Sequence, residues 1–161
     1  MSNEYKDWLD GFLADLTDKQ RKNYELCMKY PILIPRNARE GYSYEYTLLD
    51  LIPSGWRIAF GEDWARDVQE VLDKLSKEEQ DEVCILDIKE KYGYLHVYFN
   101  FYNKELNEVL QKYADLSKRT CIGCGKLATK ISWTWICPWC DDCSTKVRAT
   151  MIDINEFFKE E

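Results

Sequence analysis

Residues 119–143 read RTCIGCGKLATKISWTWICPWCDDC and contain five of the seven cysteines in a chain of 161 residues. Cys121 and Cys124 form one C-x-x-C pair, which presents two thiols from a single tight turn. Gly125 follows, where the backbone of such a turn needs a positive φ. A second cysteine pair downstream completes a spacing typical of tetrahedral zinc sites, so the stretch predicts a Zn²⁺-binding module.

The second pair has two alternatives. Cys140 with Cys143 leaves 15 residues between the pairs, whereas Cys137 with Cys140 leaves 12. Zinc sites built from two C-x-x-C pairs usually have a spacer of about 15–20 residues. We therefore favour Cys140 and Cys143, with Cys137 as a spare thiol close to the site and an alternative ligand. Four thiolates saturate zinc and leave no position for water, which predicts a structural metal.

Charge is distributed unevenly along the chain. Residues 1–116 carry 15 Lys/Arg against 23 Asp/Glu, and residues 151–161 carry 1 against 4, whereas residues 117–150 carry 6 against 2. The basic segment is the one that holds the cysteines, so we interpret its charge mainly as a counter-charge for the thiolates. The acidic remainder argues against general nucleic-acid binding, which depends on Lys/Arg contacts to phosphates.

Cysteine usage and hydropathy indicate the cellular compartment. The sequence contains no run of about 18 apolar residues, so it predicts no membrane span. The acidic N-terminus is unlike a signal peptide. An odd number of cysteines fits metal binding in a reducing compartment better than a set of disulfides. We expect a cytoplasmic protein, in the host cytoplasm if it is encoded by a phage, with no membrane partner and no evident small-molecule substrate.

The remaining elements predict an α+β fold. Apolar spacing indicates helices over 5–16 and 61–76, a capping box at 17–20 begins a helix that ends before Pro31, and Asn103 caps another. Residues 31–56 are expected to be extended or loop-like. The expected domains are a helical and β-hairpin body (1–116), a zinc-ribbon or zinc-knuckle module (117–150) and an acidic C-terminal tail (151–161).

Residues 82–102 predict the hairpin, because β-branched and aromatic residues flank a turn that contains Gly93. Alternate residues of a strand share a face. The face expected to be buried carries Leu95, Val97, Phe99 and Phe101, and the other carries Tyr94, His96, Tyr98, Asn100 and Tyr102. In the same way, Trp133 and Trp135 either cover the metal site or present an aromatic surface, and packing is the expected use. Cys27 and Cys84 are expected to be small buried residues.

A catalytic constellation is not evident. His96 is the single histidine, which restricts acid–base and nucleophilic schemes that use imidazole. Asp87 and Lys89 have the D-x-K spacing of some metal-dependent nucleases, but no partner carboxylate is identifiable. We therefore expect no enzyme and regard a nuclease as the less favoured alternative.

Five stretches in this order carry a family resemblance: KYPILIPRN, SGWRIAFGEDW, ILDIKEKYGYLHVYF, SKRTCIGCG and CDDC. Together they resemble a set of small, largely uncharacterised zinc-binding proteins of bacteriophages and prophages. That pattern has a glycine-tryptophan before a helix, a V-K-E-K-F-G-x-L-R-x-Y hairpin, C-x-x-C-G, and a final C-x-x-H or C-x-x-C. The resemblance implies that Cys121, Cys124, Cys140 and Cys143 are the ligands and that Cys137 is the extra cysteine. His96 replaces the arginine of the pattern.

These observations favour a non-enzymatic, phage-type zinc protein that acts by binding another macromolecule. An acidic phage product of this size could compete for the basic nucleic-acid groove of a host defence complex, as many anti-CRISPR proteins do, which makes a protein the expected partner. The alternative is a regulatory nucleic-acid-binding zinc ribbon that contacts phosphates through its basic residues and stacks tryptophan on bases. The candidate binding residues are Trp133, Trp135, Tyr94, His96, Tyr98, Lys118 and Arg119.

Overall fold

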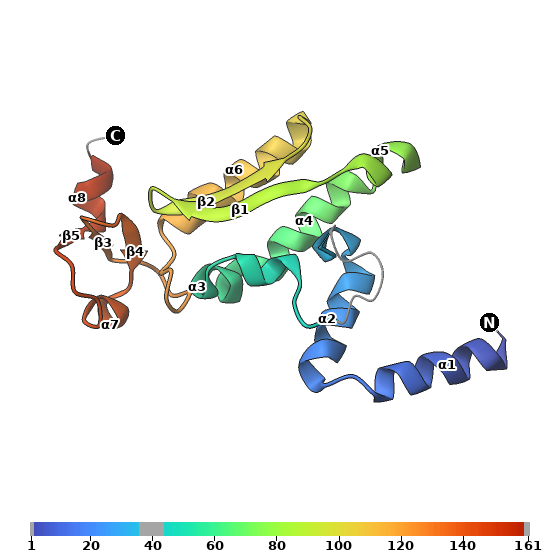
Figure 1. Ribbon diagram of the computed structural model, residues 1–161. Helices are drawn as coiled ribbons and strands as arrows, with labels where there is room; N and C mark the ends of the chain where they lie inside the picture. The colour runs from blue at the N-terminus through green and yellow to red at the C-terminus, as the bar shows by residue number, and fades with distance from the viewer. Residues whose placement is uncertain (1, 36–43, 160–161) are drawn as a thin grey trace. The chain divides into compact units, whose positions relative to one another are not determined.

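The computed structural model describes residues 2–35 and 44–159. These residues form the α+β fold that the sequence predicts, with small antiparallel sheets packed against helices (Figure 1). The chain divides into two compact units, Met1–Leu48 and Leu49–Glu161. The expected boundaries after residues 116 and 150 stay predictions, and the part of the expected loop at 36–43 lies outside the described residues. Across the described ranges, every helix is too short or too polar to cross a lipid bilayer.

The N-terminal unit consists of helices whose ends are set by local hydrogen bonds. Helix α1 spans Asn3–Ala14 and α2 spans Asp18–Lys29. The capping box that begins α2 is confirmed: Thr17 Oγ1 accepts from the Gln20 backbone N–H at 3.1 Å, and Gln20 Oε1 accepts from the Thr17 N–H at 2.8 Å. A single 3₁₀ turn, η1 at Pro31–Leu33, follows where proline stops the helix.

The C-terminal unit contains most of the helices and all of the strands described. The 3₁₀ turn η2 (Leu48–Leu51) spans the boundary between the units. The other helical segments are α3 (Ser54–Trp56), the π-helical turn η3 (Arg57–Gly61), α4 (Glu62–Leu72), α5 (Lys77–Glu82), α6 (Lys104–Lys118), α7 (Asp141–Ser144) and α8 (Ile154–Lys159). Its strands are β1 (Ile85–Lys91), β2 (Tyr94–Phe99), β3 (Lys130–Ser132), β4 (Cys137–Trp139) and β5 (Met151–Asp153).

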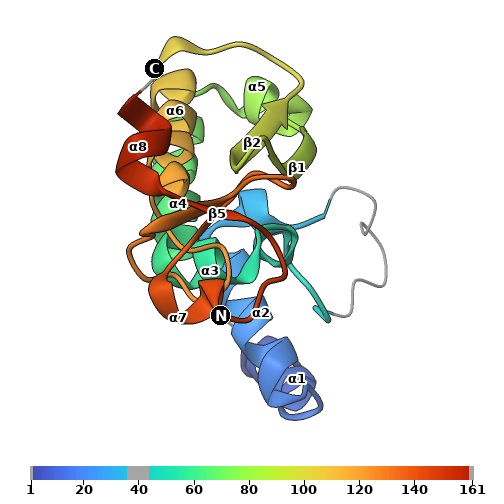
Figure 2. The ribbon, with the colours of Figure 1, turned by 90° about the vertical axis from the view of Figure 1, so that its left-hand side faces the viewer.

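Strands β1 and β2 form the predicted antiparallel hairpin, with Ile88 opposite Val97. Tyr92 and Gly93 make its turn, both with positive φ, as a two-residue hairpin requires. Helix α6 runs alongside the hairpin in both views (Figures 1 and 2). Of the face expected to be buried, Leu95 is 3% exposed, whereas the other three residues are only half-buried, because a two-stranded ribbon is too narrow to cover them all.

The second sheet has the strand order β4-β3-β5. Strand β5 comes from the segment expected to be a C-terminal tail, and it pairs antiparallel with β3 so that Ile152 lies opposite Ile131. Helix α8 follows at once and places Ile154 in a small apolar core with Ala128 and Ile131. The described part of the tail therefore completes the sheet that carries the cysteine module.

Helix α3 begins directly against the backbone of the first cysteine pair. The Gly55 N–H donates to the Ile122 carbonyl at 2.9 Å, and the fully buried Trp56 donates its indole N–H to the Thr120 carbonyl at 2.8 Å. A Cβ on Gly55 would lie 2.2 Å from the Cys121 carbonyl oxygen. Only glycine allows this close approach of two backbones.

This contact predicts that Gly55→Ala destabilises the protein by about 3 kcal/mol or more, because neither backbone can move away without breaking hydrogen bonds. The matched control is Gly61→Ala in the same helical run, where the new Cβ would meet the flexible Arg57 side chain at 3.3 Å. That change is expected to stay within about 1 kcal/mol of wild type. Urea unfolding of the metal-loaded variants measures both, and equal stability of the two would contradict the close contact.

Candidate metal centre

The first cysteine pair lies in a tight turn held by its own backbone. The Cys121 N–H donates to the Lys126 carbonyl at 2.7 Å, and the Gly125 N–H donates to the Cys121 carbonyl at 3.0 Å. Gly125 has φ +86°, and a Cβ there would lie 2.7 Å from the Gly55 carbonyl oxygen. The turn thus needs glycine for its own conformation and for its contact with α3.

The second cysteine pair lies at the start of a helix. Cys140 is the N-cap of α7, and its Sγ accepts from the Cys143 backbone N–H at 3.3 Å. The first turn of a helix directs unpaired N–H groups outward, which favours negative charge such as a thiolate. Gly123 brings the two pairs together, since a Cβ there would lie 3.3 Å from Cys143 Sγ.

The four sulfur atoms of Cys121, Cys124, Cys140 and Cys143 lie within 4.8 Å of one another. Cys124 Sγ and Cys140 Sγ are 3.6 Å apart. A zinc–sulfur bond of about 2.3 Å places tetrahedral sulfurs about 3.8 Å apart, so the cluster has the size that a four-thiolate site requires. Cys121 and Cys140 are buried, whereas Cys124 and Cys143 are partly exposed and leave an approach for an ion. These residues could hold a metal ion.

The pKa values of Cys121 and Cys143 have the pattern expected of crowded thiols. Burial raises the pKa of Cys121, but the backbone N–H groups of Cys140, Cys124 and Gly123 donate to its sulfur and hold the pKa at about 7, below the ordinary 9.0. Burial, and then the neighbouring cysteine side chains, raise the pKa of Cys143 to about 12. A divalent cation would remove this mutual repulsion, because it makes the deprotonated form of each ligand favourable.

Cys137 lies apart from the group of four. It is fully buried on β4, and its neighbour is Glu90 of the β1–β2 hairpin. Burial, followed by the negative charge of Glu90, raises the pKa of the Cys137 thiol far above its ordinary value. The structure therefore places the expected spare thiol in a buried position beside Glu90.

The two tryptophans expected to pack in the core are exposed, so that expectation is wrong. Trp133 is 56% exposed and Trp135 55% exposed, because both lie in the turn between β3 and β4. The Trp135 indole N–H donates to Glu90 Oε2 at 3.3 Å. The tryptophan that does pack here is Trp139, whose indole N–H donates to Ser132 Oγ at 3.0 Å and whose ring lies against Gly123.

The polar face of the hairpin carries a row of rings. The centroids of Tyr94 and His96 are 4.2 Å apart, and those of His96 and Tyr98 are 6.0 Å apart. His96 Nε2 lies 3.0 Å from the Lys91 carbonyl oxygen, and Nδ1 lies 3.2 Å from the Tyr98 hydroxyl. Burial lowers the pKa of His96 below 6.5. Both ring nitrogens of this histidine therefore have partners on the hairpin.

The basic candidates are both engaged in contacts. Lys118 Nζ lies 4.9 Å from the centre of the Tyr94 ring and 3.6 Å from Asp115 Oδ1. The Arg119 guanidinium lies 4.6 Å from the centre of the Phe158 ring on α8. The structure thus brings Lys118 to the row of rings, whereas Arg119 helps to hold the C-terminal helix.

The D-x-K pair is an ion pair on the surface. Lys89 Nζ lies 3.0 Å from Asp87 Oδ2, and both side chains are about half exposed. Among the described residues, the cysteine cluster is the one group of three or more Cys, His, Asp or Glu side chains that could hold a metal. Of the two isolated cysteines, Cys27 is fully buried, which raises its pKa to about 11, and Cys84 is only half-buried.

Sequence reasoning missed three residues that position the site or its surroundings. Gly55 and Trp56 fix α3 on the first cysteine turn, and the glycine-tryptophan of the resemblance was the available signal. The third is Glu90, whose carboxylate accepts from the Gly93 N–H at 3.0 Å and from Trp135. Nothing in the sequence pattern pairs Glu90 with a tryptophan 45 positions away.

No family model matches the chain, and neither a curated protein nor a solved structure gives a match. The phage resemblance stays a prediction.

The cluster predicts different outcomes for two cysteines of the same stretch. Cys143→Ser removes one of the four clustered sulfurs and should weaken zinc affinity by more than about 100-fold, a loss larger than that from residues that only orient ligands. Cys137→Ser should still bind one zinc per chain. Competition with a chromophoric chelator measures both affinities. If Cys137→Ser lost zinc and Cys143→Ser kept it, the assignment of the four ligands would be wrong.

Proposed function

We propose that this chain is a non-enzymatic zinc protein that acts by binding another macromolecule. The observation that carries the proposal is the cluster of four cysteines, with sulfurs within 4.8 Å of one another. Zinc fits such a set better than a hard cation, because thiolate ligands select soft or borderline metals. With four protein ligands the ion has no open position, so its role is to hold the 121–143 segment together rather than to activate water.

The partner is proposed to be a protein with a basic surface. The chain carries 29 Asp/Glu against 22 Lys/Arg, a net charge of −7. Several acidic side chains are exposed along the helices, among them Glu78, Glu79 and Asp81 on α5. Complementary charge accelerates association and disfavours partners of like sign. Thiolate ligands also require a reducing compartment, which supports a cytoplasmic location.

The resemblance to phage proteins extends this proposal to the kind of complex that is bound. A host defence complex guided by a nucleic acid has a basic groove, and an acidic phage protein would compete with the nucleic acid for it. The chain would then be an anti-CRISPR-like inhibitor. The phage-like order of motifs and the acidic charge support this reading.

Affinity capture from a nuclease-treated bacterial lysate tests the proposal. The metal-loaded chain is expected to retain a protein that binds nucleic acid, and added RNA or DNA should compete with the chain for it. A bait stripped of metal by a chelator is the control and should retain less, because its C-terminal module is unfolded. Recovery of no specific protein by the loaded chain, or of one that nucleic acid does not displace, would contradict the proposed inhibition.

A second function is favoured by the row of rings on the hairpin. Lys118 lies over Tyr94, and Lys89 Nζ lies 5.7 Å from the centre of the Tyr98 ring. Aromatic rings beside cations on a strand face are the parts that proteins use to bind single-stranded nucleic acid. Both lysines are also paired with carboxylates, Asp115 and Asp87, so the electrostatic contribution would be small.

Fluorescence anisotropy with a labelled oligothymidine tests this second function. With at most about three lysines near the rings, the logarithm of affinity should fall with the logarithm of salt with a slope of about −2. Tyr98→Ala should weaken binding by at least about fivefold, since stacking of one base contributes 1 kcal/mol or more. Tyr102→Ala is the control, because Tyr102 is 78% exposed beyond the end of β2. An affinity unchanged in Tyr98→Ala removes this function.

A further inference from the structure

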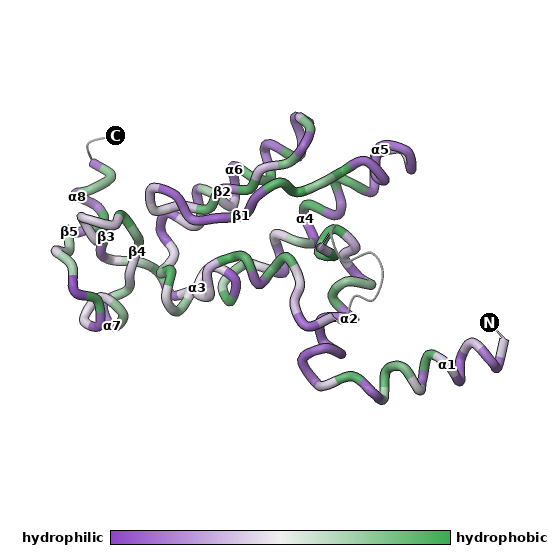
Figure 3. The backbone as a smooth tube through the Cα atoms, in the orientation of Figure 1, coloured by the Kyte–Doolittle hydropathy of each residue, from purple (hydrophilic) through white to green (hydrophobic). Residues whose placement is uncertain are grey.

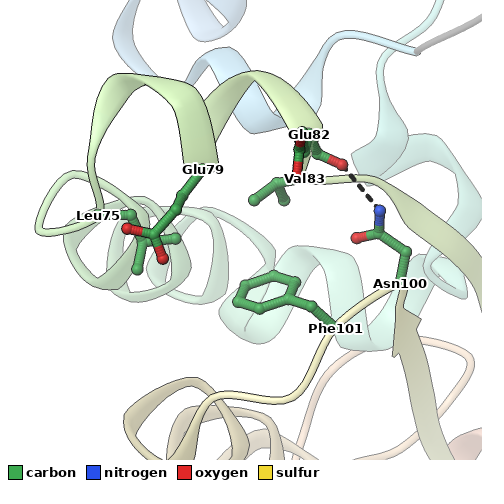
Figure 4. Close-up of a pocket in the computed structure, with 6 residues that line it drawn as sticks. All are labelled: Leu75, Glu79, Glu82, Val83, Asn100 and Phe101. Atoms are coloured by element: carbon green, nitrogen blue, oxygen red, sulfur yellow. Dashed lines mark hydrogen bonds between the residues drawn. The ribbon is translucent and has the colours of Figure 1, made fainter.

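A pocket of about 210 Å³ opens where α5 meets the end of the β1–β2 hairpin that lies opposite its turn (Figure 4). It is lined by Leu75, Glu79, Glu82, Val83, Asn100 and Phe101. The three apolar side chains are half-buried and the three polar residues are exposed. The pocket therefore has apolar walls and an acidic edge.

The apolar walls enclose space for one large side chain. The Val83 side chain and the Phe101 ring point into the same space, and Leu75 lies on its far side (Figure 4). An apolar cavity of about 150 Å³ is large enough to hold benzene. A pocket of about 210 Å³ thus accommodates a leucine, methionine or phenylalanine side chain.

Asn100 shapes the pocket by joining two elements of its wall. Its Nδ2 donates to the Glu82 carbonyl at 2.7 Å, and its Oδ1 accepts from the Cys84 N–H at 2.9 Å. The amide thus ties the end of α5 to the hairpin through both its nitrogen and its oxygen. The Glu79 carboxylate is the charged group at this site that we assign to polar recognition.

The carboxylates at the edge belong to a strongly acidic segment. Residues 73–82 carry five Asp/Glu against two Lys, and one of these lysines, Lys74, is paired with Glu105. Figure 3 colours α5 as hydrophilic along its length. Glu79 Oε1 accepts from the Ser76 N–H at 3.2 Å, and its second carboxylate oxygen remains for a cation. Such a rim attracts lysine or arginine and repels acidic groups.

From this pairing of apolar walls with an acidic rim we infer that the pocket holds one large apolar side chain of a protein partner, flanked in the partner by lysine or arginine. The apolar residue is the anchor, because burial in a preformed pocket gives most of the binding energy of a contact of this kind. The flanking cations provide orientation and selectivity. This inference rests on the proposed function and names the contact through which a basic partner would be held.

The test uses the metal-loaded full-length chain and short peptides of lysine and arginine. The peptides differ in one central residue, which is leucine or glycine. The leucine peptide is expected to bind at least 10-fold more tightly than the glycine peptide of equal charge and to shift the methyl NMR signals of Leu75 and Val83. Val83→Phe fills the pocket and should make the two affinities equal. Ile58→Phe is the matched control, because Ile58 is 73% exposed on η3, and it should keep the preference for leucine.

Each other outcome has a defined meaning. Equal binding of the leucine and glycine peptides by wild type would show charge attraction alone and overturn the inference. Equal binding of leucine peptides with basic and with acidic flanks would also overturn it, because the rim would then have no role. If Val83→Phe captures the lysate partner as well as wild type does, the pocket is wrong and the proposed function stands. Capture of no partner by wild type removes the proposed function itself, whatever the peptides show.

Discussion

Four cysteines whose sulfurs lie within 4.8 Å of one another can all be deprotonated together only when a cation neutralises their negative charge, and the C-terminal unit is arranged around this constraint. The first pair lies in a glycine-dependent turn and the second at the start of α7, where backbone N–H groups donate to sulfur. Helix α3 lies directly on the turn through Gly55 and Trp56. A change at the sulfur cluster would therefore alter the support of α3, of the β4-β3-β5 sheet and of the hairpin contact through Glu90.

Within the C-terminal unit, the metal site and the surfaces available for binding are separate. The sulfurs lie between two turns, with Cys121 and Cys140 buried, and four of them would leave a bound ion no open coordination position. The pocket beside α5 lies at one end of the β1–β2 hairpin, and the row of rings lies on β2 of that hairpin. Neither includes a clustered cysteine. A metal ion held by the four cysteines would stabilise a small sheet that has few buried residues of its own.

Local signals in the sequence predicted the parts of the fold that depend on local physics. The helix starts at Thr17 and Asn103 could be predicted, because capping joins residues only three positions apart. The hairpin and the cysteine pairs could also be predicted, because a two-residue turn and a C-x-x-C turn each depend on residues that are close in the sequence. The position of Cys137 was not, because it depends on the approach of β4 to Glu90, and the exposure of Trp133 depends on where the β3–β4 turn falls. Strand β5 was missed because its three residues gain their stability from pairing with β3, not from their own propensity.

X-ray absorption at the zinc edge of the purified chain is the most direct test of this account. We expect one zinc per chain, bound by four sulfur atoms at about 2.3 Å and by no lighter ligand. The same spectrum should be obtained from Cys137→Ser, since that thiol lies outside the cluster. A chain without stoichiometric metal, or a zinc with an oxygen or nitrogen ligand in its first coordination sphere, would contradict the closed structural site on which the account depends.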